Sequence, residues 1–244
     1  MKIIYTGIIC LSLSLSGCIK EENYGQALIA GLTLIQAATL EESQVKKAAF
    51  LSAVQMDKKS TVAPVTSRYA KRLARLTRGL ENVDGMKLNY KVYIDKNVNA
   101  FAMADGTVRV YSGLLDLMPD EQVLAVIGHE IGHVKLKHSY NQMKQEMLTS
   151  AAFQAANVTE GTLAEISSSQ FGVLAHRAIS AQYSQKDELQ ADQYALGFLR
   201  WRGMSPIAMR DSITTLQTTQ GSSSGFLSSH PSNNRRIEAI NRAL

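Results

Sequence analysis

The sequence predicts an α+β domain that is mostly helical, with a small antiparallel sheet directly before a largely buried helix. Apolar residues recur at helical spacing through residues 119–134, which predicts that helix. Residues 90–111 instead have a strand-like pattern on both sides of Asp105-Gly106, a strong hairpin signal. The 244 residues allow one domain of ordinary size with its own core, which we place at residues 41–244.

The chain begins with the pattern of a secretory signal. A charged start leads into an apolar run that ends near residue 15, too short for a permanent transmembrane helix. Residues 15–18, Leu-Ser-Gly-Cys, resemble the lipobox of bacterial lipoproteins, which implies a signal peptide over residues 1–17 and a lipidated Cys18. The alternatives are a plain signal peptide cut elsewhere or a short hydrophobic helix. Ile19 stands where an aspartate would signal inner-membrane retention, so we expect an outer-membrane anchor facing the periplasm.

Residues 18–40 are predicted to be a lipidated tether with an N-terminal helix. Polar residues interrupt its apolar run, so we do not expect a membrane span there. Processing would remove Cys10 and lipidate Cys18, which leaves no thiol for a disulfide. The net charge of +5 is modest and indicates no nucleic-acid partner, only weak attraction to anionic lipid.

Two further helices are predicted before the sheet, at residues 41–59 and 67–80. The second has a basic face, which we expect to be solvated, with contact to lipid phosphates as the alternative. That face consists of Arg68, Lys71, Arg72, Arg75 and Arg78. Strands are expected at residues 90–94, 99–104 and 107–111, forming one antiparallel sheet.

The helix at residues 119–134 carries an H-E-x-x-H pattern. Residues four apart lie on one helix face, so His129 and His133 can offer imidazole nitrogens to one metal ion. Glu130 lies about 100° further round the helix, where it can take a proton from an attacking water instead of binding the metal. The alternative is a pair of ordinary histidines, but buried His and Glu side chains need partners that this helix does not obviously offer. The pattern therefore indicates a metalloprotease centre.

A later predicted helix can complete that centre. Glu188 and Asp192 lie four residues apart on one face. A catalytic zinc needs three protein ligands and one open position, and Glu188 can be the third ligand. Asp192 can hydrogen-bond the far nitrogen of a ligand histidine and fix its tautomer. Alone, such a pair would more often be a solvated face with local partners such as Lys186, but after H-E-x-x-H we favour the metal site.

The remaining histidines near the motif have weaker signals. Ser139 stands where the class with three histidine ligands has its last one, which excludes that class. His138 lies roughly 140° round the helix from His133, so a place at the surface or behind the ligands is favoured over ligation.

The middle of the chain, residues 139–180, is predicted as a pair of helices that are broken near residues 157–162 and at Gly172. The pair could be a lid over a cleft or simply scaffold. His176 is expected to be a structural histidine there, and Trp201, near the end of the Glu188 helix, is expected to be a packing residue.

Taken together, the motifs resemble those of the HtpX-type zinc metallopeptidases, family forty-eight of the metallopeptidases. They follow one another over roughly 140 residues, which makes the resemblance specific. The predicted lipobox and the lack of predicted spanning helices resemble the LoiP-like outer-membrane lipoprotein branch. The matching motifs are Asn99-Ala100-Phe101-Ala102, Gly106 with residues 108–114, the H-E-x-x-H, Glu188-Leu189-Gln190-Ala191-Asp192 and Ser229-His230-Pro231.

The resemblance implies a zincin-like (gluzincin) fold and a zinc endopeptidase that degrades unfolded or misassembled envelope proteins. It implies one zinc ion per chain on His129, His133 and Glu188, with Glu130 as general base. It also implies that His230 stabilises the oxyanion of the reaction. The strand edge is expected to contact the substrate peptide, or else to be purely structural; its residues are Asn99, Ala100, Phe101 and Ala102.

A rival function is a zinc-binding periplasmic chaperone lipoprotein with little turnover. The intact Glu130 argues against it, because binding alone needs no general base.

Overall fold

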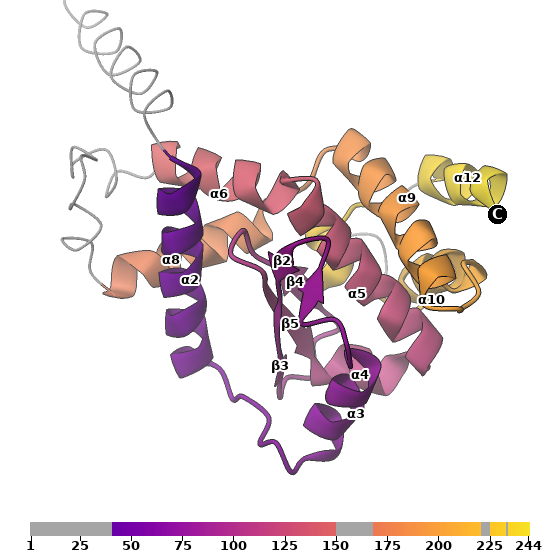
Figure 1. Cartoon of the computed structure of the whole chain (residues 1–244), viewed down its shortest axis with the longest axis horizontal. Helices are drawn as coiled ribbons and strands as arrows, with labels where there is room; N and C mark the ends of the chain where they lie inside the picture. Colours follow the sequence, from indigo (N-terminus) through magenta and orange to yellow (C-terminus); the bar gives the residue numbers. More distant parts are fainter. Residues whose placement is uncertain (1–40, 150–167, 221–224, 233) are drawn as a thin grey trace, which may run out of the picture.

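The computed structural model describes residues 41–149, 168–220, 225–232 and 234–244. The predicted signal peptide, Cys18 and the tether lie outside these residues. The expected loop near residues 157–162 lies outside them too. The mostly helical α+β fold predicted from the sequence is confirmed, and a small sheet precedes the helix that carries H-E-x-x-H (Figure 1).

The sheet has three strands, β3 (Asn89–Tyr93), β4 (Ala100–Ala102) and β5 (Thr107–Tyr111), in the order β3-β5-β4. The hairpin between β4 and β5 is confirmed, and Gly106 takes a φ of 90° in its turn, a conformation that favours glycine. The expectation of an all-antiparallel sheet is wrong, because β3 pairs parallel with β5. Alternation gives strand faces but not strand order, and β5 inserts between the two preceding strands.

A tight turn at Asp84 and Gly85 joins a separate two-stranded ribbon. Its strands are β1 (Asn82–Val83) and β2 (Met86–Lys87), which pair antiparallel. Asp84 and Gly85 both have positive φ, as a two-residue hairpin turn requires.

The helices form two groups on either side of the sheet (Figure 1). Helix α5, which carries the H-E-x-x-H motif, lies against β4 and β5 and packs along α9. On the other side α2 packs against α6 and α8, and apolar side chains from these helices meet Tyr93 and Phe101 of the sheet. The helices are α2 (Glu42–Lys59), α3 (Arg68–Leu76), α4 (Ser112–Leu117), α5 (Asp120–Lys135), α6 (His138–Thr149), α8 (Ser168–Ser180), α9 (Gln185–Trp201), α10 (Ile207–Gln220), α11 (Phe226–Ser229) and α12 (Asn234–Ala243).

Several details differ from the sequence prediction. The sheet does not lead directly into α5, because α4 lies between them. Gly172 does not break the chain and lies inside α8. His176 is exposed on α8 and so is not a structural core histidine. Trp201 does pack, with its ring centroid 6.0 Å from that of Phe198, but it is 63% exposed at the end of α9.

Two glycines allow α5 to approach α9 closely. A Cβ atom on Gly128 would lie 2.5 Å from the Phe198 ring, and one on Gly132 would lie 3.2 Å from the Cα atom of Ala191. Neither approach leaves room for a larger residue without a shift. The glycines beside the histidines therefore set how near α9 comes to the motif.

The basic face of α3 is largely exposed, as expected for a solvated face, and three of its arginines also form ion pairs within the protein. Arg72 Nε lies 2.7 Å from Oδ1 of Asp120, and an Nη2 atom of Arg75 lies 2.6 Å from Oδ2 of the same carboxylate. Arg68 pairs with Asp116. These contacts attach α3 to α4 and to the first residue of α5.

A buried ion pair joins α2 to the sheet. Asp57 accepts hydrogen bonds from Arg109, Lys91 and Tyr93 at 2.7 to 2.9 Å, and Arg109 is 2% exposed.

Across the ranges described by the structure, no helix combines the length and the hydropathy that crossing a membrane would need.

Candidate active site

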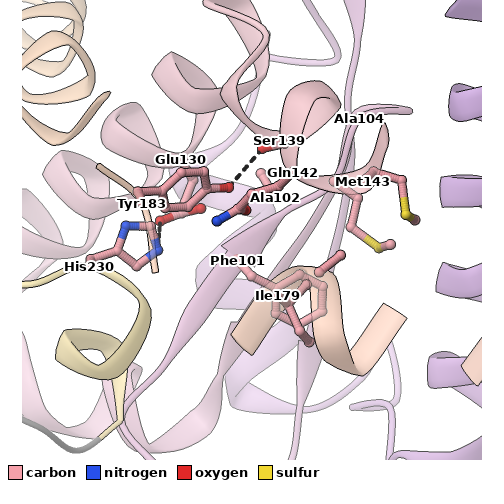
Figure 2. A pocket seen from close by; sticks show the side chains of 12 residues that line it. Phe101, Ala102, Ala104, Glu130, Ser139, Gln142, Met143, Ile179, Tyr183 and His230 are labelled. Atoms are coloured by element: carbon pink, nitrogen blue, oxygen red, sulfur yellow. Dashed lines mark hydrogen bonds and ion pairs between the residues drawn. The ribbon is translucent and has the colours of Figure 1, made fainter. Parts of the chain in front are cut away.

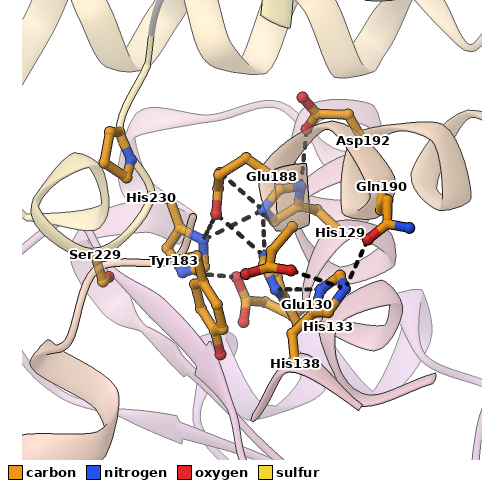
Figure 3. A network of polar contacts seen from close by, with 12 residues as sticks. His129, Glu130, His133, His138, Tyr183, Glu188, Gln190, Asp192, Ser229 and His230 are labelled. Atoms are coloured by element: carbon orange, nitrogen blue, oxygen red, sulfur yellow. Dashed lines mark hydrogen bonds and ion pairs between the residues drawn. The ribbon is translucent and has the colours of Figure 1, made fainter. Parts of the chain in front are cut away.

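The side chains of α5 and α9 converge at the close approach of the two helices (Figure 3). The Nε2 atoms of His129 and His133 lie 3.0 Å apart. Glu188 reaches from α9, with Oε1 3.3 Å from His133 Nε2 and Oε2 3.6 Å from His129 Nε2. The three side chains are 0 to 1% exposed. The residues predicted as metal ligands therefore lie around one buried point.

The spacing of these atoms fits a metal ion. Zinc lies about 2.0 to 2.2 Å from nitrogen and oxygen ligands, so two corners of its tetrahedron are about 3.3 to 3.5 Å apart. The observed separations of 3.0, 3.3 and 3.6 Å bracket that value. With His230, the potential ligand atoms all lie within 4.8 Å of one another.

The tautomer of His129 also suits a metal ligand. Its Nδ1 atom lies 2.9 Å from Oδ1 of Asp192, a carboxylate oxygen that can accept its proton. A proton held on Nδ1 leaves the lone pair of Nε2 facing the cluster. Asp192 thus lies where the sequence prediction placed it, one turn beyond Glu188 and behind a histidine.

Sequence reasoning missed Arg236, which is 0% exposed on α12. Its guanidinium donates to both carboxylate oxygens of Asp192 at 2.7 and 2.6 Å, and Nη1 lies 2.5 Å from Oε2 of Glu188. Burial alone would raise the pKa of both carboxyls, but Arg236 and the neighbouring histidines together outweigh it and hold both pKa values below their usual range.

The charges of the buried site favour a divalent cation. When Glu130, Glu188 and Asp192 are ionised, three carboxylates surround the guanidinium of Arg236. Burial lowers the pKa of His230, but Glu130 and Glu188 outweigh burial and raise that pKa, so this ring can carry one further positive charge. The remaining excess of negative charge would be costly in a buried site unless a cation compensates it. Burial also lowers the pKa of His133 far below its usual value, which keeps that ring neutral and able to bind a metal.

Glu130 lies on the wall of a narrow cleft beside the sheet (Figure 2). Burial raises the pKa of its carboxyl above the usual value. Phe101 and Ala102 of β4 line the same cleft, whereas Asn99 and Ala100, also predicted to bind substrate, do not. The opposite walls come from α6, α8 and the following residues, and include Ser139, Gln142, Met143, Ala178, Ile179 and Tyr183.

His230 occupies the fourth side of the cluster. Its Nδ1 atom lies 3.0 Å from Oε1 of Glu188 and 3.3 Å from Nε2 of His129, and its Nε2 atom lies 3.3 Å from Oε1 of Glu130. The ring stacks on Phe226 with centroids 4.2 Å apart. Nδ1 of His230 thus lies among the proposed ligand atoms. The sequence prediction, in which His230 only stabilises the oxyanion, does not require it to be so near them.

Tyr183 is a second residue that sequence reasoning missed. Its ring stacks on His133 at a centroid distance of 3.7 Å, and its hydroxyl lies 3.1 Å from Oγ of Ser139. Burial raises the pKa of the phenol, so it stays neutral at physiological pH. A single aromatic residue before a predicted helix gave no pattern that could have identified it.

The chain matches known metallopeptidases over most of its length. The sequence model of peptidase family M48 matches residues 67–244. The chain is 41% identical to metalloprotease LoiP of Escherichia coli K12 over 228 residues, which are 93% of this chain and 90% of LoiP. It is 39% identical to metalloprotease YcaL of the same organism over 232 residues, 93% of this chain and 91% of YcaL.

A more distant relative is a putative beta-barrel assembly-enhancing protease of Vibrio cholerae, 26% identical over 198 residues, which are 77% of this chain and 40% of that protein.

The fold and the buried cluster define a metallopeptidase. The chain belongs to peptidase family M48 and is a metalloendopeptidase.

Proposed function

We propose that this protein is a zinc endopeptidase that is anchored to the outer membrane through a lipidated Cys18 and degrades unfolded or misassembled proteins of the cell envelope. The observation that carries the proposal is the convergence of His129, His133 and Glu188 beside a buried Glu130. The predicted lipobox supports the anchor, and the name of the Vibrio cholerae relative refers to beta-barrel assembly.

The chemistry divides between the ion and the chain. Zinc held by His129, His133 and Glu188 would polarise the scissile carbonyl and acidify a water. Glu130 accepts the proton of the attacking water and passes it to the leaving amine. Its raised pKa suits this work, because a base whose pKa lies nearer to the working pH also returns the proton more readily.

The cleft supports a role for β4 in holding the substrate. Because β4 is an edge strand of the sheet, an extended peptide can add beside it through main-chain hydrogen bonds. Phe101 and Ala102 line the cleft next to Glu130, so a peptide there would pass the base. Such binding requires an extended peptide whose main-chain N–H and C=O groups are free, which an unfolded protein offers more readily than a folded one.

His230 would serve the reaction as a donor and not as a ligand. A catalytic zinc on His129, His133 and Glu188 would need one position free for water, whereas Nδ1 of His230 lies beside Glu188 and His129 here. A ring that swings away from Glu188 while staying near Glu130 can donate a hydrogen bond to the oxyanion, the part that the family resemblance gives it.

The experiment uses the full chain, purified from membranes in detergent, as wild type and as Glu130→Gln. We expect wild type to cleave unfolded casein and to leave a stably folded protein intact. We expect Glu130→Gln to cleave neither. Binding of casein without cleavage by wild type would instead favour the chaperone. A Cys18→Ser variant should leave the membrane fraction, and its retention there would contradict the lipid anchor.

A further inference from the structure

His138 is buried behind the metal cluster, and the proposed mechanism does not use it. The side chain is 5% exposed and lies just past the end of α5, at the start of α6. Its Nδ1 atom lies 3.1 Å from Nδ1 of His133, and its Nε2 atom lies 3.3 Å from Oε1 of Gln190 (Figure 3). Nε2 also lies 3.4 Å from Oδ1 of Asp187. His138 thus connects one proposed ligand to the polar side of α9.

The hydrogen-bond chain has a single arrangement that leaves His133 free to bind a metal. Nε2 of His133 faces His129 and Glu188, so it must carry no proton when it binds. The ring then holds its proton on Nδ1 and donates it to the nearest acceptor, Nδ1 of His138. His138 in turn holds its proton on Nε2, which faces the oxygens of Gln190 and Asp187.

The reverse arrangement excludes the metal. If Nδ1 of His138 carried the proton, Nδ1 of His133 would have to accept it, and the His133 proton would then lie on Nε2, inside the cluster. His133 can therefore bind a metal ion only in the arrangement in which Nδ1 of His138 carries no proton and accepts the proton of His133.

We propose that His138 is a positioning residue that fixes the orientation and tautomer of His133 by accepting its Nδ1 proton, as Asp192 does for His129. This inference rests on the proposed metal site. The two supports differ in charge, because Asp192 is an anion held by Arg236 while His138 is a neutral ring. His138 is not among the potential ligand residues and does not line the cleft, so it acts through His133.

A matched pair of substitutions separates this role from simple packing. In His138→Asn the amide oxygen can take the place of Nδ1 and still accept from His133. In His138→Gln the polar atoms lie one bond further out, near the place of Nε2, and the His133 proton loses its acceptor. The exposed His176 on α8 provides a control, His176→Gln.

The measurement is the zinc dissociation constant of the full chain in detergent, determined by competition with a chromogenic chelator. Losing a hydrogen bond behind a ligand histidine typically weakens metal binding about 10- to 100-fold. We expect that loss for His138→Gln, a change below about threefold for His176→Gln, and an intermediate or near-normal value for His138→Asn. Thermal melting in excess EDTA checks the fold, and zinc should raise the midpoint least in His138→Gln.

Equal zinc affinity of His138→Gln and wild type would overturn the inference. Equal loss in the Asn and Gln variants, with unchanged melting in EDTA, would also overturn it, since an acceptor at the Nδ1 position would then not matter. If wild type itself binds no zinc, the proposed function fails instead, so the two failures are distinguishable.

Discussion

The Nη1 atom of Arg236 lies 2.5 Å from Oε2 of Glu188, which joins the last helix of the chain to the proposed metal site. Because Oε2 is held by Arg236, the other oxygen, Oε1, is the one that points to His133. The same guanidinium holds Asp192 behind His129. One buried cation thus orients a ligand and the support of another ligand.

Replacing Arg236 should therefore destabilise the whole protein. Arg236→Ala leaves two buried carboxylates without their cation, and breaking a buried pair in this way typically costs about 3 to 5 kcal/mol. Urea denaturation in EDTA measures the loss. The neighbouring Arg235→Ala removes an exposed hydrogen bond to Gln185 and should change stability by less than about 0.5 kcal/mol. Equal stability of the two variants would mean that Arg236 is not the hub that the structure indicates.

Replacing His230 should affect catalysis more than metal binding. His129, His133 and Glu188 remain as ligands in His230→Ala, while the donor near Glu130 is lost. Loss of an oxyanion donor typically lowers kcat by about 10²- to 10³-fold. Initial rates on casein, with zinc quantified in the same samples, test this. A variant more active than wild type would instead show that His230 blocks the site.

Asp57 should make stability depend on acid pH. Burial raises its pKa, but hydrogen bonds from Arg109, Lys91 and Tyr93 outweigh burial and lower the pKa to about 2 from a usual value of 3.8. A carboxyl with a lowered folded pKa stabilises the protein above its unfolded pKa, and that stability is lost as the pH falls toward 2. The shift corresponds to about 2 kcal/mol.

Asp57→Asn should therefore be less stable than wild type at pH 7, and the gap should shrink below pH 4. Denaturation over a pH series measures both. Asp116→Asn is the control, because its carboxylate pairs with Arg68 at the surface and should contribute little. A gap for Asp57→Asn that is constant from pH 7 to pH 2.5 would contradict the shifted pKa.

The sequence predicted most of the helices and which side chains would gather at the site. Spacing within one helix places His129 near His133 and Glu188 near Asp192, and the coordination chemistry of zinc links the two pairs. Arg236 and Tyr183 could not be found in this way. Each reaches the site from a separate element by a contact that depends on tertiary packing, and neither belongs to a repeating pattern.

The spacing of apolar residues in the sequence also could not predict the order of the strands or the partners of surface side chains. Alternation in β3 fits either side of the hairpin, so the parallel pairing with β5 had no local signal. Helical periodicity gave α3 a polar face without showing that Asp116 and Asp120 lie against it.

The central claim is that His129, His133 and Glu188 hold one zinc ion beside a base that does not bind it. The most direct test is the zinc content per chain of full-length wild type, Glu130→Gln and Glu188→Gln, purified in parallel. We predict about one zinc per chain in the first two and far less in Glu188→Gln, because a neutral amide replaces an anionic ligand. Zinc missing from wild type, or retained fully in Glu188→Gln, would contradict the account.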